Sequence, residues 1–463
     1  MASFTIKEVQ QASGAEILNT GAHESFDGIS TDTRTIREGN LFVALSGENF
    51  DGHRFVRQAV EKGAYGVVVS RADAANDLPE SVSVFLVKDT KKALEGCARF
   101  HRLRFNIPVI GVTGSNGKTT TKDMISAVLG TTYSVCRTVA NHNNEIGLPM
   151  TVMNMPEDTE LLVAELGTNH PGEIAYLSAI AQPDYAVITN IGIAHIEYLG
   201  SREGILREKL DILRSSLKNT VGIFNGDEPL LCNVRDKGTH KKYYFGIDNP
   251  SCDVVASGIQ ELDDGMRFHV SGFHHEFELF VPALGRHMVY NALAAATVGL
   301  AMGVKPETIQ NELSIFRNTG MRQKIYEKNG MTIIEDCYNA GPESTEAALG
   351  VLASVKTSGK RIAVLGDMLE LGNRSSAEHY RIGRIAAQKA DLLLTYGAHA
   401  VRRVTGAITG GMSPKNAEHF DTHEDLVRML KMRAGEADVI LFKGSRGMKM
   451  ERVLQMFLDD HEA

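Results

Sequence analysis

The sequence predicts an α/β protein built from three domains. Short apolar runs of strand length alternate with stretches of helical periodicity along the chain, a pattern typical of sheets covered by helices. One apolar run leads into a glycine-rich loop and then a helix, as in nucleotide-binding α/β domains. At 463 residues the chain exceeds the size at which a single core stops growing. We expect a small α/β domain over 1–85, a central doubly wound domain over 86–316 and a Rossmann-like domain over 317–463.

The first domain is predicted from alternating helices and buried strands. Apolar residues at helical spacing predict helices, whereas short apolar runs bounded by turn residues predict strands. The expected elements are helices over 5–18 and 53–62 and strands over 41–44 and 65–69, and a further helix is expected to follow over 91–105. The last of these helices leads towards the central domain and must end before Pro108, because the residue that precedes a proline disfavours the helical conformation.

The central domain begins with a buried strand over 109–113, a glycine loop and a helix over 118–129. Further apolar strands at 161–165, 185–189 and 221–225 are separated by helix-like stretches, which is the order of a doubly wound sheet. Between Cys252 and Leu284 the pattern changes to alternating short strands around an Asp-Asp-Gly turn at 263–265. This change predicts a β-hairpin elaboration of the sheet.

The last domain shows the same α/β alternation. Its buried strands are predicted at 333–336, 361–365, 392–396 and 439–442, and each has helical material nearby. We therefore expect a second Rossmann-like unit, joined to the central domain by a short hinge.

Composition and charge exclude several classes of protein. A net charge of −8 argues against a general nucleic-acid binder, which needs a basic surface to neutralise phosphates. The five cysteines are scattered and form no CxxC pair, so we expect neither a disulfide framework nor a zinc site. No basic-then-apolar leader and no apolar run of about 20 residues is visible. We expect a cytoplasmic protein with no membrane or nucleic-acid partner.

The strongest chemical signal is the segment VIGVTGSNGKTT at 109–120, where a strand enters a glycine loop that opens a helix. Gly114 and Gly117 let the backbone wrap closely around phosphate oxygens. Lys118 adds a positive charge to the free N–H groups of the helix start, and the Thr119 hydroxyl can reach Mg²⁺. Taken alone, the loop predicts a nucleotide-phosphate site, which a P-loop switch or kinase would also have.

A resemblance to a known family enters where the loop departs from a strict Walker A pattern, which has glycine in place of Val112. The shortened loop TGSNGKTT at 113–120 resembles the ATP loop of the Mur ligase superfamily, which includes the folylpolyglutamate synthases. The segments ELGTNHPGEI at 165–174, LGDMLELG at 365–372 and FKGSRG at 442–447 resemble the branch of that family that adds D-alanyl-D-alanine.

The resemblance implies a three-domain, monomeric ATP-dependent ligase that forms a C–N bond through an acyl phosphate. The implied substrates are UDP-N-acetylmuramoyl-tripeptide and D-alanyl-D-alanine, in peptidoglycan precursor synthesis. The implied cofactors are two Mg²⁺ ions and a CO₂-derived carbamate on Lys209. Other ligases remain as alternatives, namely a tripeptide synthetase or a folylpolyglutamate-type synthase, and outside the ligases a P-loop switch or kinase remains.

Candidate residues for ATP and metal follow from position and from the family's motifs. Glu165 follows a buried strand at the ligand-binding edge of a parallel sheet, where a carboxylate can hold Mg²⁺. By position alone Lys209 is an exposed helix lysine beside solvated Glu208 and Asp211; by resemblance it is the carbamylated lysine, and His195 is a metal ligand. The expected metal set is Thr119, Glu165, His195 and Lys209, and the expected catalytic set is Lys118, His195, Lys209 and Arg322. The expected ATP set is Gly114, Ser115, Asn116, Gly117, Lys118, Thr119, Thr120, Asn291, Arg322 and Asp336.

Candidate substrate residues lie near both ends of the chain and in one central loop. The segments at 30–34 and 41–53 resemble a uridine-diphosphate-binding domain, although a surface turn would look similar. Arg322 is suited to neutralise the ATP γ-phosphate, and Asp336 to hydrogen-bond the ribose. The expected substrate set is Ser30, Thr31, Asp32, Arg34, Gly47, Asn143, Asn144, Asn339, Lys443, Ser445 and Arg446. Two positions depart from the family's pattern, since Met288 and Gly341 each stand where relatives carry asparagine.

Overall fold

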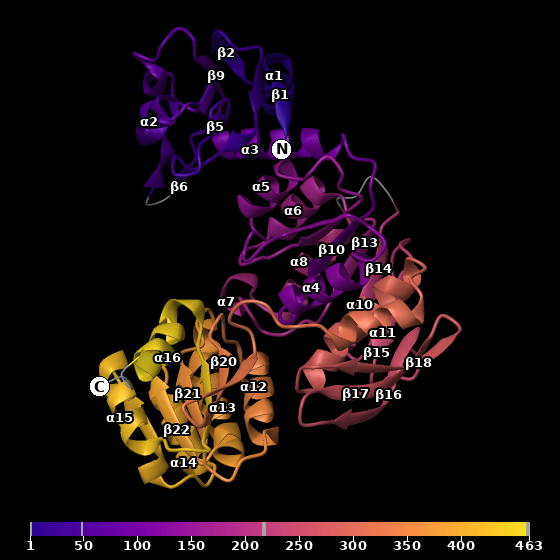
Figure 1. Ribbon diagram of the computed structural model, residues 1–463, viewed down its shortest axis with the longest axis vertical. Helices are drawn as coiled ribbons and strands as arrows, with labels where there is room; N and C mark the ends of the chain where they lie inside the picture. Colours follow the sequence, from indigo (N-terminus) through magenta and orange to yellow (C-terminus); the bar gives the residue numbers. More distant parts are fainter. Residues whose placement is uncertain (1, 48–49, 215–218, 460–463) are drawn as a thin grey trace.

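The computed structural model describes residues 2–47, 50–214 and 219–459 and shows three lobes (Figure 1). Each lobe is built around one main sheet, of five, nine or six strands, and the expected α/β class is confirmed. The strands of these sheets fall within the three predicted ranges, except that one strand continues one residue past 85, to Leu86. Among the described residues, no helix has both the length and the apolar character needed to cross a membrane.

The N-terminal lobe contains a mixed sheet with two small ladders beside it. The sheet order is β2 (Glu16–Asn19), β9 (Ser83–Leu86), β8 (Gly66–Val69), β5 (Leu41–Val43) and β4 (Ile29–Ser30). β2 is antiparallel to β9, and the other pairs are parallel. The ladders are β1 (Ser3–Thr5) with β3 (Ser25–Asp27), and β6 (Ser46–Gly47) with β7 (Phe50–Asp51). A short helix, α2 (Val56–Glu61), precedes β8.

The first helix is shorter than the sequence predicts. α1 (Ile6–Ser13) starts at a capping box between Thr5 and Glu8 and ends at Gly14, whose φ of 67° is left-handed. Residues 16–18, predicted as the end of this helix, instead belong to strand β2, which pairs antiparallel with β9. The prediction over 5–18 was therefore wrong in its second half, because periodicity alone does not separate a short strand from a last helical turn.

Helix α3 (Thr90–Arg102) joins the N-terminal and central lobes. It packs against α1 and also against α5 (Gly147–Met153) and α6 (Glu173–Ala181) of the central lobe. His101 on this helix is buried beside the rings of Phe4 and Phe105, and neither ring nitrogen has a hydrogen-bond partner among the described residues. Burial lowers the pKa of His101 to about 4, so the ring is neutral in the folded protein.

The central sheet places the glycine loop in its interior. Its order is β11 (Val135–Arg137), β12 (Leu161–Glu165), β10 (Val109–Thr113), β13 (Tyr185–Ile188), β14 (Val221–Asn225), β15 (Lys242–Gly246), β16 (Val254–Glu261), β17 (Met266–Gly272) and β18 (His275–Val281). Strands β11 to β16 are parallel, and β16, β17 and β18 form the predicted antiparallel elaboration. The loop after β10 therefore emerges between the carboxyl ends of β12 and β13.

The helix that follows the glycine loop packs closely against a second helix of the central lobe. α4 (Lys118–Leu129) packs against α10 (Arg286–Ala301), and a Cβ added at Gly299 would come within 2.9 Å of Val128 Cγ1, so the two helices approach closely. Ile110 and Val112 of β10 are fully buried, and a buried aliphatic side chain contributes about 1.5–3 kcal/mol. The remaining helices of this lobe are α7 (Ile196–Leu199), α8 (Arg202–Leu210), α9 (Pro229–Cys232) and α11 (Pro306–Ser314).

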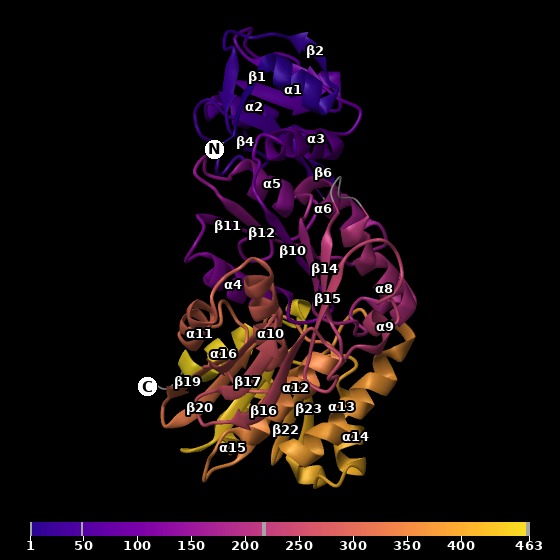
Figure 2. The ribbon, with the colours of Figure 1, turned by 90° about the vertical axis from the view of Figure 1, so that its right-hand side faces the viewer.

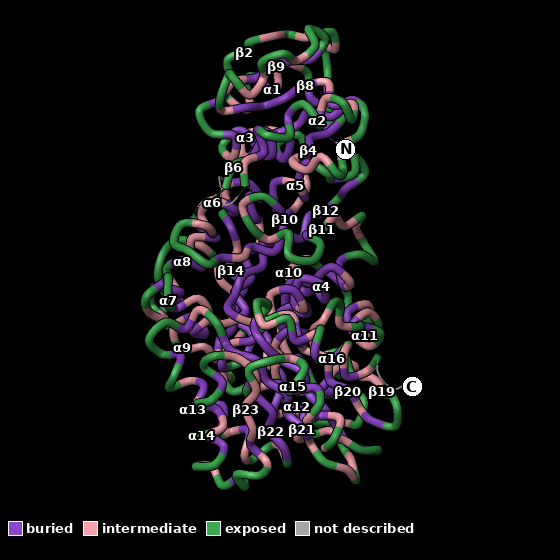
Figure 3. The backbone as a smooth tube through the Cα atoms, turned by 90° about the vertical axis from the view of Figure 1, so that its left-hand side faces the viewer, coloured by how far each residue is buried: buried purple, intermediate pink, exposed green. Residues whose placement is uncertain are grey.

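The last lobe is a mostly parallel six-stranded sheet. Its order is β19 (Lys324–Lys328), β20 (Met331–Asp336), β24 (Val439–Lys443), β21 (Arg361–Gly366), β22 (Leu392–Tyr396) and β23 (Ala417–Phe420), with only β19 antiparallel. Its helices are α12 (Pro342–Ser354), α13 (Ser375–Lys389), α14 (Val401–Thr409), α15 (His423–Arg433) and α16 (Met450–Asp459). Figure 3 shows buried backbone running through the strands, with exposed backbone at the outer loops. The loops after β20, β21 and β24 reach the site described next.

Candidate functional site

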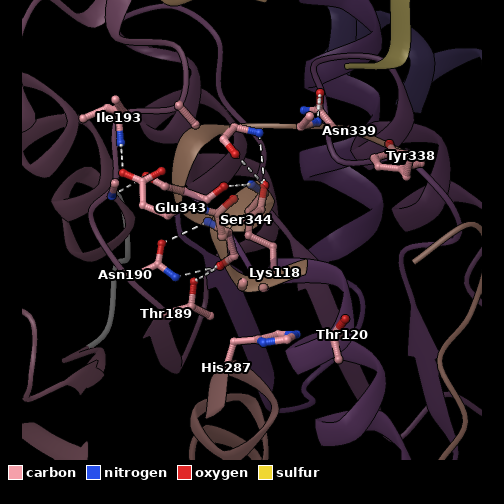
Figure 4. A pocket seen from close by; sticks show the side chains of 18 of the residues that line it. Lys118, Thr120, Thr189, Asn190, Ile193, His287, Tyr338, Asn339, Glu343 and Ser344 are labelled. Carbon is pink, nitrogen blue, oxygen red and sulfur yellow. Dashed lines mark hydrogen bonds between the residues drawn. The ribbon is translucent and has the colours of Figure 1, made fainter. Parts of the chain in front are cut away.

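A cleft of about 990 Å³ lies between the central and last lobes (Figure 4). Loops after β10, β12 and β13 form its central-lobe wall, and loops after β20, β21 and β24 face them. The predicted site residues that line it are Ser115, Asn116, Gly117, Lys118, Thr120, Asn143, Asn144, Glu165, His195, Asn291, Arg322, Asp336, Asn339, Lys443, Ser445 and Arg446. Residues more than 300 positions apart in the sequence thus meet in one cavity.

The glycine loop requires glycine at two positions. Gly114 has φ +152°, and a Cβ there would lie 1.8 Å from the Thr189 hydroxyl oxygen. Gly117 has φ +80°, and a Cβ there would lie 2.5 Å from Asn291 Oδ1. Positive φ combined with close approach is the condition that glycine alone tolerates. The backbone of the loop is therefore fixed against neighbouring polar side chains, as a phosphate cradle needs.

The side chain of Lys118 folds back over this loop. Its ammonium donates to the carbonyl oxygens of Gly114 at 2.8 Å and Ser115 at 3.4 Å. Burial lowers the pKa of Lys118, Glu165 opposes that shift, and the positive charge of Arg322 adds to it. The first turn of α4 therefore offers free N–H groups and a nearby cation to an anion.

Thr119 and Glu165 supply oxygen ligands of the kind that Mg²⁺ prefers. The Thr119 hydroxyl donates to Glu165 Oε2 at 2.8 Å, and Asn143 Nδ2 donates to Glu165 Oε1 at 2.7 Å. Mg²⁺ is commonly held by one or two carboxylates together with substrate phosphates and water. No group of three or more His, Cys, Asp or Glu side chains suited to a metal occurs in the described part of the chain. The donor set fits a Mg²⁺ ion that is bound jointly with phosphate.

His195 contacts the last lobe across the cleft. Its backbone is left-handed, with φ 60°, and its Nδ1 is hydrogen-bonded to Oε2 of Glu370 in the last lobe. Hydrogen bonding to His195 lowers the pKa of Glu370. The predicted metal ligand thus also contributes to the contact between the two lobes.

Lys209 is buried, which corrects the view of it as an exposed helix lysine. Its exposed fraction is 2%, and its amine has no hydrogen bond or ion pair within the described residues. Burial lowers the pKa of Lys209 well below its usual value, and the charge of Lys118 adds to that effect. The solvated role predicted for Glu208 was wrong too, because its carboxylate is buried and accepts N–H groups of Gly172 and Ile174 at the start of α6.

Asn291 and Arg322 lie on either side of the hinge between the lobes. Asn291 is buried and accepts a hydrogen bond from Thr121 at 3.2 Å. The guanidinium of Arg322 stacks over the ring of Tyr338 at 3.9 Å. Asp336 accepts from the Lys443 ammonium at 2.6 Å, and this pair is largely buried. Lys443 was predicted to bind substrate, and in this structure its ammonium donates to Asp336 and to the carbonyl oxygen of Asn339.

The remaining predicted residues of the last lobe differ in exposure. Ser445 is buried and connects two loops, since its hydroxyl donates to Ala340 O and accepts from the Leu369 amide. Arg446 is exposed and pairs with Glu451 at 2.9 Å. Arg446, with 57% of its side chain exposed, is the more accessible of the two to a ligand.

The two departures from the family's pattern leave the local structure intact. Met288 is buried, and its sulfur lies 3.7 Å from the side-chain nitrogen of Asn291. Gly341 has an extended φ of −130° and donates its N–H to the Ser344 hydroxyl. An extended backbone suits any residue, so glycine is not required at this position.

The predicted uridine-diphosphate residues lie outside the cleft. Asp32 and Arg34 form a bidentate pair after β4, and the Ser30 hydroxyl accepts from the Asp32 amide. No described residue before Ser115 lines the cleft. Turned by 90°, the N-terminal lobe still lies at one end of the molecule, away from the last lobe (Figure 2). Ser30, Thr31, Asp32, Arg34 and Gly47 thus lie in the N-terminal lobe and do not line the cleft.

Three side chains that line or support the cleft had no role in the sequence-based prediction. Asn190 Oδ1 accepts from the Asn116 amide, and Glu343 accepts from the Ile193 amide across the cleft (Figure 4). Glu370 binds His195. Glu370 stands in the LGDMLELG segment, Asn190 lies five residues before His195, and Glu343 lies two residues after Gly341, so all three lie close to residues named from the sequence.

Comparison with known proteins identifies the family. Models described as "Mur ligase middle domain", "Mur ligase, glutamate ligase domain" and "Mur ligase family, catalytic domain" match residues 112–299, 321–446 and 25–102. The UDP-N-acetylmuramoyl-tripeptide--D-alanyl-D-alanine ligase of Bacillus subtilis (strain 168) is 42% identical over 99% of each chain.

Solved structures give the same result. A crystal structure of MurF from Acinetobacter baumannii superposes with a TM-score of 0.91 at 31% identity, over 99% of this chain and 100% of that one. MurF ligase from Thermotoga maritima in complex with ADP superposes with a TM-score of 0.82 at 31% identity, over 94% and 97%. The chain belongs to the Mur ligase family.

Proposed function

We propose that this chain joins D-alanyl-D-alanine to UDP-N-acetylmuramoyl-tripeptide, using ATP, in peptidoglycan precursor synthesis. As a Mur ligase it is an ATP-dependent enzyme that forms a C–N bond. The observation that carries the proposal is the cleft in which a phosphate loop faces the polar loops of a second lobe. Full-length similarity to ligases named for these two substrates supports the choice of substrates.

The ATP half of the site is assigned to the glycine loop and its neighbours. The loop amides and Lys118 hold the phosphates, and Thr119 and Glu165 hold Mg²⁺. Arg322 lies close enough to Lys118 for their charges to interact, so its guanidinium can neutralise the γ-phosphate. Asn291 and Asp336 line the same cleft and are assigned to the nucleoside. When bound, Mg²⁺ offsets the negative charge that develops on the phosphate oxygens.

The reaction proceeds in two displacements. An oxygen of the terminal carboxylate attacks the γ-phosphorus, the bond to the bridging oxygen breaks, and ADP leaves. The amine of D-alanyl-D-alanine then attacks the acyl carbon, phosphate leaves, and the nitrogen loses a proton as the amide forms. No nucleophilic side chain takes part, because positioning and charge stabilisation account for most of the rate in phosphoryl transfer.

Lys209 is assigned to a carbamate that supplies an anionic oxygen to a second Mg²⁺. Its buried amine has no partner among the described residues, and a lysine kept as a bare cation in that place would be costly. Reaction with CO₂ replaces the cation with an anion and so removes its repulsion with Lys118. His195 is assigned to the same ion.

The two ends of the chain are assigned to the substrates. Residues 30–34 and Gly47 of the domain over 1–85 bind the uridine diphosphate. Asn143 and Asn144 contact the peptide beside the domain over 86–316, and the domain over 317–463 receives the dipeptide through Asn339, Ser445 and Arg446. Lys443 acts there through its pair with Asp336. We further propose a cytoplasmic monomer, since the cleft forms within one chain and the five cysteines are all free thiols.

The test is a phosphate-release assay with each substrate omitted in turn. We expect phosphate only when ATP, UDP-N-acetylmuramoyl-tripeptide and D-alanyl-D-alanine are all present. Phosphate release with UDP-N-acetylmuramoyl-dipeptide and a free diamino acid would instead favour a tripeptide synthetase, and release with a folate and glutamate a folylpolyglutamate synthase. Release without any amine would contradict the ligase assignment.

A further inference from the structure

The loop over 189–197, which follows β13, is bound to the phosphate loop at one end. The Ser115 hydroxyl oxygen accepts from the Gly192 amide at 2.9 Å, and the Asn116 amide donates to Asn190 Oδ1 at 2.9 Å. The hydroxyl of Thr189 also donates to the carbonyl oxygen of Asn116. Any shift of the phosphate loop when it takes up a nucleotide must therefore move this loop with it.

The same loop is bound to the last lobe by two carboxylates. The Ile193 amide, next to Gly192, donates to Glu343 Oε1 at 3.0 Å in the first turn of α12 (Figure 4). His195 Nδ1 is hydrogen-bonded to Glu370, whose carbonyl oxygen also accepts from the Glu197 amide. The backbone at Gly372 packs beside Glu197, because a Cβ there would lie 3.4 Å from its Cβ.

We propose that Glu343 and Glu370 form an interdomain clasp that couples the state of the phosphate loop to the seating of the last lobe. Both are positioning residues, since they act through the loop over 189–197 and not on the phosphate loop itself. The inference rests on the proposed function only for its kinetic consequences. Without the clasp, the last lobe would still be attached but would bring Arg322 to the ATP site less often.

The clasp is distinct from the contacts at the hinge. There, Gln323 accepts from His287 and donates to the carbonyl oxygen of Leu284, while Thr319 donates to Asp123 on α4. Those contacts lie within a few residues of the covalent connection and can persist when the cleft opens. Glu343 and Glu370 lie beyond it in the last lobe, so their bonds exist only when the lobes are seated together.

The exposure of the two carboxylates suits a reversible contact. Glu343 is exposed, and the side chain of Glu370 is 39% exposed. Contacts of exposed charged groups are weak, so they can break each time products leave. Buried partners in the same places would lock the cleft shut.

The experiment compares Glu343→Ala, Glu370→Ala and their double variant with Glu346→Ala. Glu346 lies on the same helix, pairs with Arg381 and does not line the cleft, so it is a matched control. Small-angle scattering of the nucleotide-free protein reports the seating of the lobes. Binding of a fluorescent ATP analogue and steady-state kinetics report the two halves of the site. Circular dichroism checks that each variant is folded.

We expect the double variant to have a larger radius of gyration and a kcat lower by about tenfold, a usual size for coupling between sites. Affinity for the ATP analogue should fall by about fivefold or more, because coupling between the phosphate loop and the last lobe is reciprocal and an unseated lobe brings Arg322 to the ATP site less often. The glutamine in Glu370→Gln can still hydrogen-bond to His195. The kcat of this variant should therefore lie much closer to the wild-type value than the kcat of Glu370→Ala.

Wild-type scattering together with wild-type kcat in the double variant would overturn the clasp, as would equal losses in Glu346→Ala. If the unmodified protein releases no phosphate with the proposed substrates, the proposed function fails. The scattering comparison then still decides the clasp, because it needs neither substrate.

Discussion

The cleft and the polar turn of the N-terminal lobe hold their charged groups in different ways. In the cleft, Glu165 receives hydrogen bonds from both Thr119 and Asn143 and is almost fully buried. At the N-terminal turn, Asp32 and Arg34 bind each other while 36% and 87% of their side chains stay exposed. The cleft is thus organised before any ligand arrives, whereas the turn must exchange one partner for another. Preorganisation favours chemistry, and exchangeable surface groups favour docking.

Removal of the cation from the phosphate loop should have the largest effect on catalysis. Lys118→Ala deletes the ammonium that lies over Gly114 and Ser115, and we expect phosphate release to fall about 10³-fold. The thermal midpoint should change little, since a cation at this position serves charge compensation more than packing. A coupled phosphate assay and a thermal melt measure the two effects. Near-normal turnover would remove Lys118 from the site.

The next change tests the carbamate. Lys209→Ala should lower turnover at least about tenfold, the range seen when groups around a metal are lost. Short carboxylic acids such as acetate or formate should restore part of the activity, because they can place a carboxylate in the vacated space. The assay is turnover against acid concentration, with Lys305→Ala as a control on the surface. Full activity of Lys209→Ala without any acid would exclude the role.

A third change tests how tightly the cleft is organised. Gly114→Ala puts a Cβ at 1.8 Å from the Thr189 hydroxyl and needs a φ of +152°. We expect the free energy of unfolding to fall by about 2–4 kcal/mol from steric overlap and backbone strain together. Urea unfolding measures it. Gly350→Ala, where nothing lies within 4 Å of the added Cβ, is the matched control. Equal stability of the two variants would contradict a rigid loop.

The junction between the lobes provides a pH test. His101 has a pKa of about 4 in the fold, against about 6.5 when unfolded, so the unfolded chain binds more protons between these values. Stability should therefore fall as the pH drops below 6.5, by about 2 kcal/mol at pH 5 from this residue. His101→Leu should flatten that part of the profile in urea titrations at several pH values, and exposed His275→Leu should not. An unchanged profile in His101→Leu would show that other groups cause the loss.

Local sequence patterns predicted the strand and helix around the phosphate loop to the residue, with β10 at Val109–Thr113 and α4 at Lys118–Leu129. Their signals are strong because a continuous apolar run and two glycines admit few other conformations. β15 and β23 were missed, since Lys242–Gly246 and Ala417–Phe420 are short and mix buried with half-exposed residues. The assignment of the strand-end carboxylate Glu165 to Mg²⁺ remains a prediction.

Contacts across the cleft could not be predicted because they join distant parts of the chain. The Ile193 amide meets Glu343 at a separation of 150 residues, and nothing near either residue marks the pair. Glu208 illustrates a related limit. Its position on α8 suggests solvent, yet α6 packs over it, and its carboxylate binds amides 34 and 36 residues away. Burial of a charged helix residue depends on its tertiary neighbours, and the spacing of apolar residues in the sequence does not show which elements those are.

A substitution at the N-terminal turn should have the smallest effect on stability. The side-chain hydrogen bond of Arg34 lowers the pKa of Asp32, but the pair is exposed, so Arg34→Ala should cost less than about 1 kcal/mol of stability. If the turn binds the uridine diphosphate, KM for the nucleotide-linked peptide should rise severalfold while KM for ATP stays unchanged, because the turn lies outside the cleft. Arg57→Ala removes a similar exposed pair, with Asp77, and should leave both constants unchanged. A rise in KM for ATP as well would mean that the N-terminal lobe is coupled to the cleft, and the two regions would then act as one site.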